Sequence, residues 1–346
     1  MSVPSATMKD LHSVITPSLL RQLHQARIPW ARTHPVTGKE IIFEFFSGNG
    51  DFVDVAKPAW LVLKAISEAY GPDNVPDMMP YLPDPRDPGF AEQAFGMHVM
   101  IDQVPRLLFQ GIDQRWTSWF DKVARKLYDH FYALDRDLWP WRRRRWADTS
   151  FEYWVCVATQ FNATMVHQES VCYQEGSQAY VEGLRQLVEH YTGHNDPAGD
   201  GSTPEVDEYT MVEMIVNLDL DHEWSFHEAA FFFFKLYNAH QPIIDRFGRY
   251  PYRNAIEGRL STDEELEWIE KVNHFAEATP EVARQVKEDI EAGRWTPLGE
   301  GTDAGGLGDA VSGRPGEDLS SETRLEITIR LVDPGREILK WLPRPA

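Results

Sequence analysis

Residues 246–265 read RFGRYPYRNAIEGRLSTDEE, and this stretch has the residue types of a corner between two helices. A cation such as Arg246 suits the negative carboxyl end of a helix. Gly248 can adopt the left-handed conformation that ends one. Pro251 forces the residue before it, Tyr250, into an extended conformation. The first half of the stretch therefore predicts the end of a helix followed by a turn.

The second half predicts the start of another helix. The hydroxyl residues at 261–262 stand three positions before the glutamates at 264–265, so either Ser261 or Thr262 can form a capping box. The helical pattern continues on both sides of this corner. We expect helices near residues 17–26, 54–71, 91–108, 116–134, 149–164, 171–191, 209–218, 226–247 and 261–276. Helices joined by short turns predict an all-α, antiparallel array.

The domain organisation follows from composition. We expect one helical domain over residues 1–295, a flexible Gly-rich loop over 296–322 and a C-terminal tail over 323–346 that packs back on the domain. A second mobile loop is expected at 193–205. Residues 324–332 alternate as a short strand does, but the residues before them could instead start a helix.

Charge and hydropathy exclude several classes of protein. The 346 residues carry a formal net charge of −20, which disfavours nucleic acid as a partner. No apolar run approaches the ~18 residues that a membrane helix needs, so we expect a cytoplasmic protein without a membrane span. Cys156 and Cys172 lack the spacing of zinc ligands and are expected to be buried thiols. The oligomeric state is left open.

Four segments resemble one known family. They read IIFEFFSGNGDF (41–52), HVMIDQVPRLLFQG (98–111), MVHQES (165–170) and the corner at 246–265. They are similar to the helical family called domain of unknown function 924, in its fungal branch. The resemblance implies an all-α fold like that of tetratricopeptide repeats (TPR-like), but no reaction. The family motif DQFPRN has Val104 and Leu107 as departures here, and Tyr252 stands where the family has histidine.

A looser resemblance links this family to norbornene-forming Diels–Alderases of sordarin-type terpenoid pathways. Twelve tryptophans and eighteen phenylalanines could line an apolar cavity, although the usual role of each such residue is to fill the core. Together these points indicate a cofactor-independent cyclase that acts on an apolar terpenoid polyene in fungal specialised metabolism. Such an enzyme would fold its substrate into a reactive conformer and activate the dienophile by a hydrogen bond.

The candidate site residues come from the resembling segments. We expect three catalytic residues, His167, Tyr252 and Arg249, with Arg249 and Tyr252 reaching the pocket. The expected substrate-binding residues are Asp102, Arg106, Glu169, Arg246 and Asn254. Arg253 is expected, with Asn254, to hold the corner together. No cofactor and no metal is expected.

Other functions fit parts of the sequence. A helical array could be a scaffold that binds a peptide or protein in a groove. A hydrolase or phosphatase would need Arg246, Arg249 and Arg253 to converge on an anion. A metal site could form from the histidines and glutamates near residues 222–240, but the HExxH motif is incomplete because Phe231 replaces its second histidine.

Overall fold

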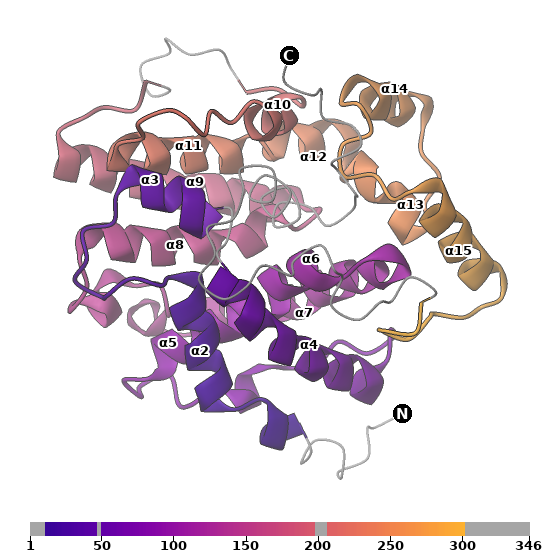
Figure 1. Cartoon of the computed structure of the whole chain (residues 1–346), viewed down its shortest axis with the longest axis horizontal. Coiled ribbons are helices and arrows are strands. Elements are labelled where there is room, and N and C mark those ends of the chain that lie inside the picture. The colour runs from indigo at the N-terminus through magenta and orange to yellow at the C-terminus, as the bar shows by residue number, and fades with distance from the viewer. Residues whose placement is uncertain (1–10, 47–49, 198–205, 302–346) are drawn as a thin grey trace.

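The computed structural model describes residues 11–46, 50–197 and 206–301. Within these ranges the chain forms helices and no strand, and the helices make one continuous array (Figure 1). The expected all-α, single-domain helical array is confirmed. The possible strand at 324–332, the tail and most of the Gly-rich loop lie outside the described residues. None of the helices described is long and apolar enough to span a bilayer.

The bounds of the main helices are as follows. In the first half they are α2 (Pro17–Arg27), α3 (Gly38–Glu40), α4 (Gly50–Tyr70), α5 (Phe90–His98), α6 (Val104–Leu108), α7 (Arg115–Ala133) and α8 (Phe151–Val166). In the second half they are α9 (Val171–Thr192), α10 (Thr210–Val216), α11 (Phe226–Asn238), α12 (Gln241–Phe247), α13 (Asn254–Glu257), α14 (Asp263–Lys271) and α15 (Pro280–Glu291).

Short 3-10 and π segments join these helices. The π segments are η1 (Ile41–Phe46) and η3 (Val99–Gln103). The 3-10 segments are η2 (Met79–Tyr81), η4 (Gly111–Gln114), η5 (Arg136–Leu138), η6 (Arg143–Trp146) and η8 (Pro251–Arg253).

The corner at 246–265 has the local structure that its sequence predicts. α12 ends at Gly248, whose φ is 70°. Tyr250 is extended, with φ −86° and ψ 112°, directly before η8. Of the two possible capping boxes, the one formed by Thr262 and Glu265 starts α14. Local rules therefore account for the backbone of this corner.

Other boundaries differ from the expectation. α4 begins at Gly50, so Pro58 lies inside the helix instead of in its first turn. The expected helix at 226–247 is broken into α11 and α12, because Pro242 at the start of α12 has no N–H with which to continue the α11 ladder. α15 was not expected, although Thr279 caps it and Pro280 is its first residue.

The expected helix at 91–108 contains a π turn. α5, η3 and α6 follow one another directly, and η3 stands just before Pro105. A proline removes one helical N–H and its ring clashes with the carbonyl four residues earlier. The wider π turn accommodates that clash, and such turns occur often at functional sites. Asp102 belongs to this turn, so the disturbance lies where the family motif has its carboxylate.

The core is built around α8. Every residue from Tyr153 to Val166 is buried, so this helix has no solvent face. A helix that is buried all round lies at the centre of a fold. α5, α7, α9 and α11 surround it (Figure 1). Polar side chains on α8 therefore face the interior and need internal partners.

We predict that Gly96→Ala destabilises the protein. α2 and α5 touch so closely that a Cβ at Gly96 would lie 1.9 Å from the carbonyl oxygen of Leu20. The two helices would have to separate, and overpacking of this kind costs about 1–3 kcal/mol or more. Gly183→Ala on α9 is the matched control, because nothing lies within 4 Å of its Cβ position. The control is expected to gain about 0.5–1 kcal/mol. Urea denaturation measures both, and an unchanged G96A midpoint would contradict the prediction.

Candidate functional site

A buried cluster of charges ties α6 and η3 to α7 and to the corner. Arg106 is fully buried, and its guanidinium donates to Asp121 Oδ1 at 2.7 Å and lies 3.4 Å from Asp102 Oδ1. Arg253 in η8 lies 3.4 Å from Asp121 Oδ2 and donates to the backbone oxygen of His167 at 3.0 Å. Two carboxylates and two guanidinium groups therefore compensate one another in the interior.

His167 stands at the carboxyl end of α8, beside this cluster. Its Nδ1 lies 2.9 Å from Asp102 Oδ1. Burial would raise the pKa of Asp102, but His167 and Arg106 outweigh it and hold that pKa well below its usual value. Burial, together with Arg106, lowers the pKa of His167 despite the attraction of Asp102. At neutral pH Asp102 is therefore ionised, and His167 is a neutral imidazole that donates its Nδ1 proton to Asp102.

The cluster continues into a buried neutral network. Thr164 donates to Asp102 Oδ1 at 3.2 Å and lies 3.1 Å from His98 Nδ1. Tyr128 donates to the backbone oxygen of Phe161 and contacts the same His98 nitrogen at 3.1 Å. Burial lowers the pKa of His98 to about 4, so its ring is neutral. These hydrogen bonds hold Asp102 in place in addition to its contacts with Arg106 and His167.

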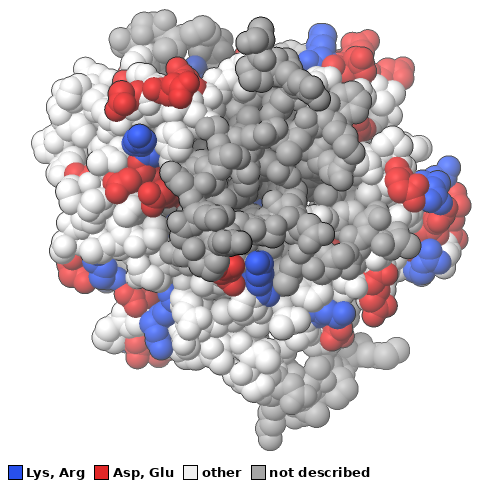
Figure 2. All heavy atoms as spheres, viewed as in Figure 1, with Lys and Arg blue, Asp and Glu red and all other residues white. Residues whose placement is uncertain are grey.

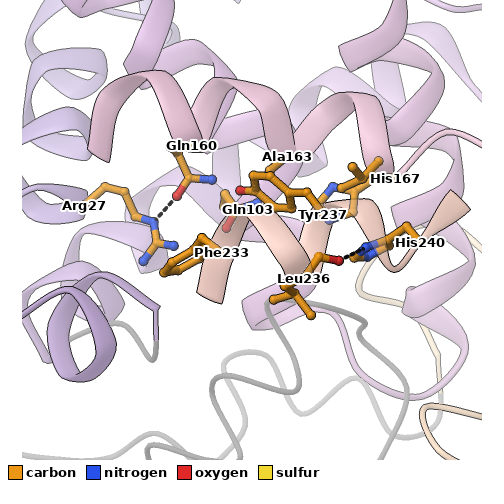
Figure 3. A pocket seen from close by; sticks show the side chains of 10 residues that line it. Arg27, Gln103, Gln160, Ala163, His167, Phe233, Leu236, Tyr237 and His240 are labelled. Atoms are coloured by element: carbon orange, nitrogen blue, oxygen red, sulfur yellow. Dashed lines mark hydrogen bonds between the residues drawn. The ribbon is translucent and has the colours of Figure 1, made fainter. Parts of the chain in front are cut away.

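A small cavity lies between α2, α8 and α11, next to His167 (Figure 3). Its volume is about 30 Å³, which is room for a few water molecules. Its apolar lining residues are Ala163, Val166, Phe233 and Leu236, and its polar ones are Arg27, Gln103, Gln160, His167, Tyr237 and His240. The cavity therefore has an aliphatic and aromatic side and several polar groups that converge on it.

Arg27 is the least satisfied of these polar groups. It is 4% exposed, and its Nε donates to Gln160 Oε1 at 2.7 Å. Its Nη1 has no hydrogen-bond partner in the described part of the chain, and no described carboxylate lies within 4.0 Å of the guanidinium. The rings of Phe45 and Phe52 lie 4.7 and 5.3 Å from its central carbon. Burial lowers the pKa of Arg27 to about 10, so the group remains a cation, with no carboxylate in ion-pair contact among the described residues.

The cluster does not suit a metal ion. Asp102, Asp121 and His167 offer ligand atoms within 4.8 Å of one another. Arg106 already donates to both carboxylates, and Arg253 stands beside Asp121. Two fixed cations thus occupy the electrostatic position that a divalent ion would need. The residues present fit an internal ion network better than a metal centre.

The structure brings three of the expected site residues together, namely Asp102, Arg106 and His167. Glu169 points elsewhere: it forms an ion pair with Arg259 and accepts from the backbone N–H of Tyr250 at 2.9 Å. It therefore holds the corner, although it stands only two residues from His167.

The expected residues of the corner lie away from the cavity. Arg249 donates to Glu265 Oε1 at 2.6 Å, and Arg246 forms an ion pair with Glu208 near the surface. Tyr252 is buried and stacks on Tyr250, with 5.3 Å between ring centroids. None of these three expected residues lines the cavity. Arg249 fails to reach it because the capping glutamate of α14 binds it.

The last corner residues hold the backbone. Asn254 donates to Ser261 Oγ at 3.0 Å, across the turn into α14. Arg253 joins the corner to the ion cluster, so both residues make the contacts that the predicted holding role needs. Asn254, which was also expected to bind substrate, does not line the cavity. Arg246, Arg249 and Arg253 each pair with a different carboxylate. They do not converge, and the anion pocket that a phosphatase would need is absent from this corner.

One expectation about the cysteines is wrong, and the alternative metal site near residues 222–240 is not formed by its histidines. Cys172 is exposed in the first turn of α9, whereas Cys156 is buried as expected. The histidines near residues 222–240 do not gather. His227 stacks on His194, with ring centroids 4.0 Å apart, while His240 is buried with its Nδ1 donating to the Leu236 oxygen at 2.8 Å.

Charges on the surface are mixed. In Figure 2, acidic and basic side chains alternate around the edge of the face shown. Many of them form close pairs, such as Arg32 with Asp148 at 2.7 Å. On the face shown, the surface charges of the described residues do not gather into a patch of one sign, so the candidate site is defined by the buried charges.

Comparison with known proteins identifies the family. Residues 82–273, more than half of the chain, match the family described as "Bacterial protein of unknown function (DUF924)". The chain belongs to this family. No curated protein and no solved structure matches it. The DUF924 segment contains Asp102, Arg106, Asp121, His167 and Arg253, and Arg27 lies outside it.

We predict that Asp121→Asn is strongly destabilising, because it leaves Arg106 and Arg253 buried without their shared carboxylate. Breaking one partner out of a buried ion pair costs about 3–5 kcal/mol. Glu208→Gln, which breaks the surface pair with Arg246, is the control and should barely change stability. Urea denaturation of the two variants tests this, and equal effects would contradict the prediction.

We also predict that the protein loses stability between pH 6.5 and 4. Burial lowers the pKa of His24 to about 3, of His98 to about 4 and of His240 to about 3. The unfolded chain, with histidine pKa values near 6.5, binds more protons than the folded chain in this window. The free energy of unfolding therefore falls as the pH falls, by up to about 1.4 kcal/mol per pH unit for each histidine.

Thermal melts across this range measure the effect. His24→Gln should flatten the profile, and His130→Gln, at a half-exposed position on α7, should not. A wild-type melting temperature that is constant from pH 6.5 to 4.5 would contradict the prediction.

Proposed function

We propose that the protein is a cofactor-independent cyclase of Diels–Alder type that acts on an apolar terpenoid polyene in fungal specialised metabolism. The observation that supports the proposal is the environment of the Arg27 guanidinium. Its Nη1 lacks a partner among the described residues, although it is buried at the wall of the cavity. A buried donor without a partner is costly, and a carbonyl oxygen of the substrate would satisfy it.

A bond from Arg27 to the carbonyl of the dienophile would lower the barrier to cycloaddition. Negative charge grows on that oxygen as the alkene accepts electron density from the diene. A donor fixed in advance in a dry site stabilises such charge far better than water does. In this proposal Arg27 has the donor role expected of Tyr252, His167 or an arginine. His167 cannot fill this role, because its proton is on the nitrogen that faces Asp102.

The apolar lining supports the second half of the proposal. Phe233, Leu236 and Val166 offer a non-polar surface against which a polyene chain can fold. Holding diene and dienophile in contact removes much of the entropic cost of the reaction. The cavity of about 30 Å³ takes only the carbonyl end of such a molecule, so the hydrocarbon part must displace side chains.

A scaffold function is the second candidate. A hollow of about 750 Å³ lies beside α10 and α11, lined in part by Met214, Trp224, Phe231 and Phe232. It is open and largely apolar, as grooves that accept a helix from a partner are. The cavity at Arg27 favours the enzyme, because a peptide groove does not need a buried cation without a counter-ion.

We predict that the purified protein accelerates cyclisation of a linear terpenoid that carries a conjugated diene and an enal. Arg27→Met should lower the rate about 10²–10³-fold, the loss typical of one oxyanion donor. Methionine keeps the bulk of the side chain, and replacing a buried charge with an apolar group often preserves stability. Arg21→Met, at an exposed position of the same helix, is the matched control and should keep the full rate.

Chiral chromatography of the products separates the possible outcomes. A single stereoisomer formed faster than in buffer supports the cyclase. If folded wild-type protein gives the buffer rate and the buffer product ratio, the cyclase proposal is wrong. Binding of an amphipathic helical peptide in the hollow beside α11 would then favour the scaffold.

A further inference from the structure

We infer that the cavity also catalyses a proton transfer, in which His167 acts as the general base that isomerises an unsaturated carbonyl substrate held by Arg27. The inference rests on the proposed function for one point only, the binding of a carbonyl oxygen at Arg27. It assigns a second activity to the site. It also explains why an imidazole oriented by a carboxylate lines the same cavity as the unpartnered cation.

The base is defined by the orientation of its ring. Nδ1 of His167 donates to Asp102 at 2.9 Å, so Nε2 carries the lone pair. No described residue forms a hydrogen bond with Nε2, while the ring lines the cavity (Figure 3). Asp102 is itself fixed by Arg106 and Thr164, which leaves the imidazole little freedom to turn. A carboxylate that orients a histidine and fixes its tautomer is the arrangement expected of a general base.

Arg27 supplies the other half of the chemistry. A proton on carbon next to an unsaturated carbonyl system is removed only if the resulting negative charge is stabilised. The Nη1 donor of Arg27 is available for the oxygen on which that charge settles. A weak base then suffices, as in ketosteroid isomerase, whose aspartate base has a pKa of about 4.6 and works with a strong oxyanion hole.

The step balances without a co-reactant. Nε2 of His167 takes a proton from the γ carbon of a conjugated enal, and the C–H electron pair forms a new double bond between the γ and β carbons. The original double bond shifts to the α and carbonyl carbons, and the carbonyl becomes an oxyanion beside Arg27. The imidazolium then returns its proton to the oxygen, the α carbon or the γ carbon. Protonation on oxygen gives a conjugated dienol, which is a diene.

The groups around His167 keep it in the form that this step needs. Asp102 attracts a proton to the ring, while Arg106 and burial oppose the charge, and their sum lowers the pKa of His167. Asp121 adds a weaker attraction, and His240, which also lines the cavity, is neutral because burial lowers its pKa to about 3. The imidazole is therefore unprotonated at pH 7 and can accept a proton.

The test uses citral, an enal with γ hydrogens but no conjugated diene, as the probe in D₂O. Mass spectrometry follows deuterium uptake at the γ carbons, while cyclisation of the diene–enal is measured in parallel. Wild-type protein should exchange citral at least tenfold faster than buffer. His167→Gln should lose at least tenfold of this rate, and His130→Gln should keep it. The exchange rate of wild type should be constant above pH 6.5 and fall only as the pH approaches the lowered pKa of His167.

The outcomes separate the two proposals. Cyclisation without exchange overturns the proton transfer and leaves the cyclase standing. Exchange without cyclisation overturns the cyclase. Exchange that is undiminished in a folded His167→Gln protein overturns the role of His167. If that variant does not fold, Arg27→Met decides the matter: exchange that is undiminished in this variant overturns the inference.

Discussion

The pairing of Arg106 with Asp121 and Asp102 is the constraint on which the rest of the interior depends. The fully buried guanidinium of Arg106 is compensated by carboxylates, and a single carboxylate could not satisfy its donors. The two aspartates come from different helical segments, and Arg253 adds the corner to the same cluster. The network therefore fixes where η3, α7 and η8 meet, which apolar packing alone would leave less specific.

The same network positions the side chains of the candidate site. Asp102 serves both Arg106 and His167, so the charge that closes the ion cluster also sets the tautomer of the imidazole. The π turn before Pro105 holds Asp102 in this shared position. One carboxylate thus compensates the buried guanidinium and orients the imidazole. Arg27, by contrast, has no carboxylate of the cluster within ion-pair distance, and the proposed binding of a carbonyl oxygen depends on that separation.

Local sequence rules predicted much of the fold but only part of the candidate site. Capping residues and glycine gave the corner at 246–265 correctly, because these signals act within a few residues. Motif resemblance pointed to Asp102, Arg106 and His167, of which only His167 lines the cavity. Arg27 was missed because its partner Gln160 is 133 positions away and its burial depends on packing. Arg249 was misjudged for the same kind of reason, since Glu265 serves as a helix cap and as its ion-pair partner.

The position of Arg27 at the end of α2 has a consequence for how such proteins diversify. The ion cluster and His167 lie within the segment shared with the DUF924 family, and the unpaired cation enters the cavity from a helix that precedes that segment. A relative could exchange the N-terminal helix and alter the polar group at this wall of the cavity without disturbing the charged interior. Selectivity and architecture would then evolve on separate parts of the chain.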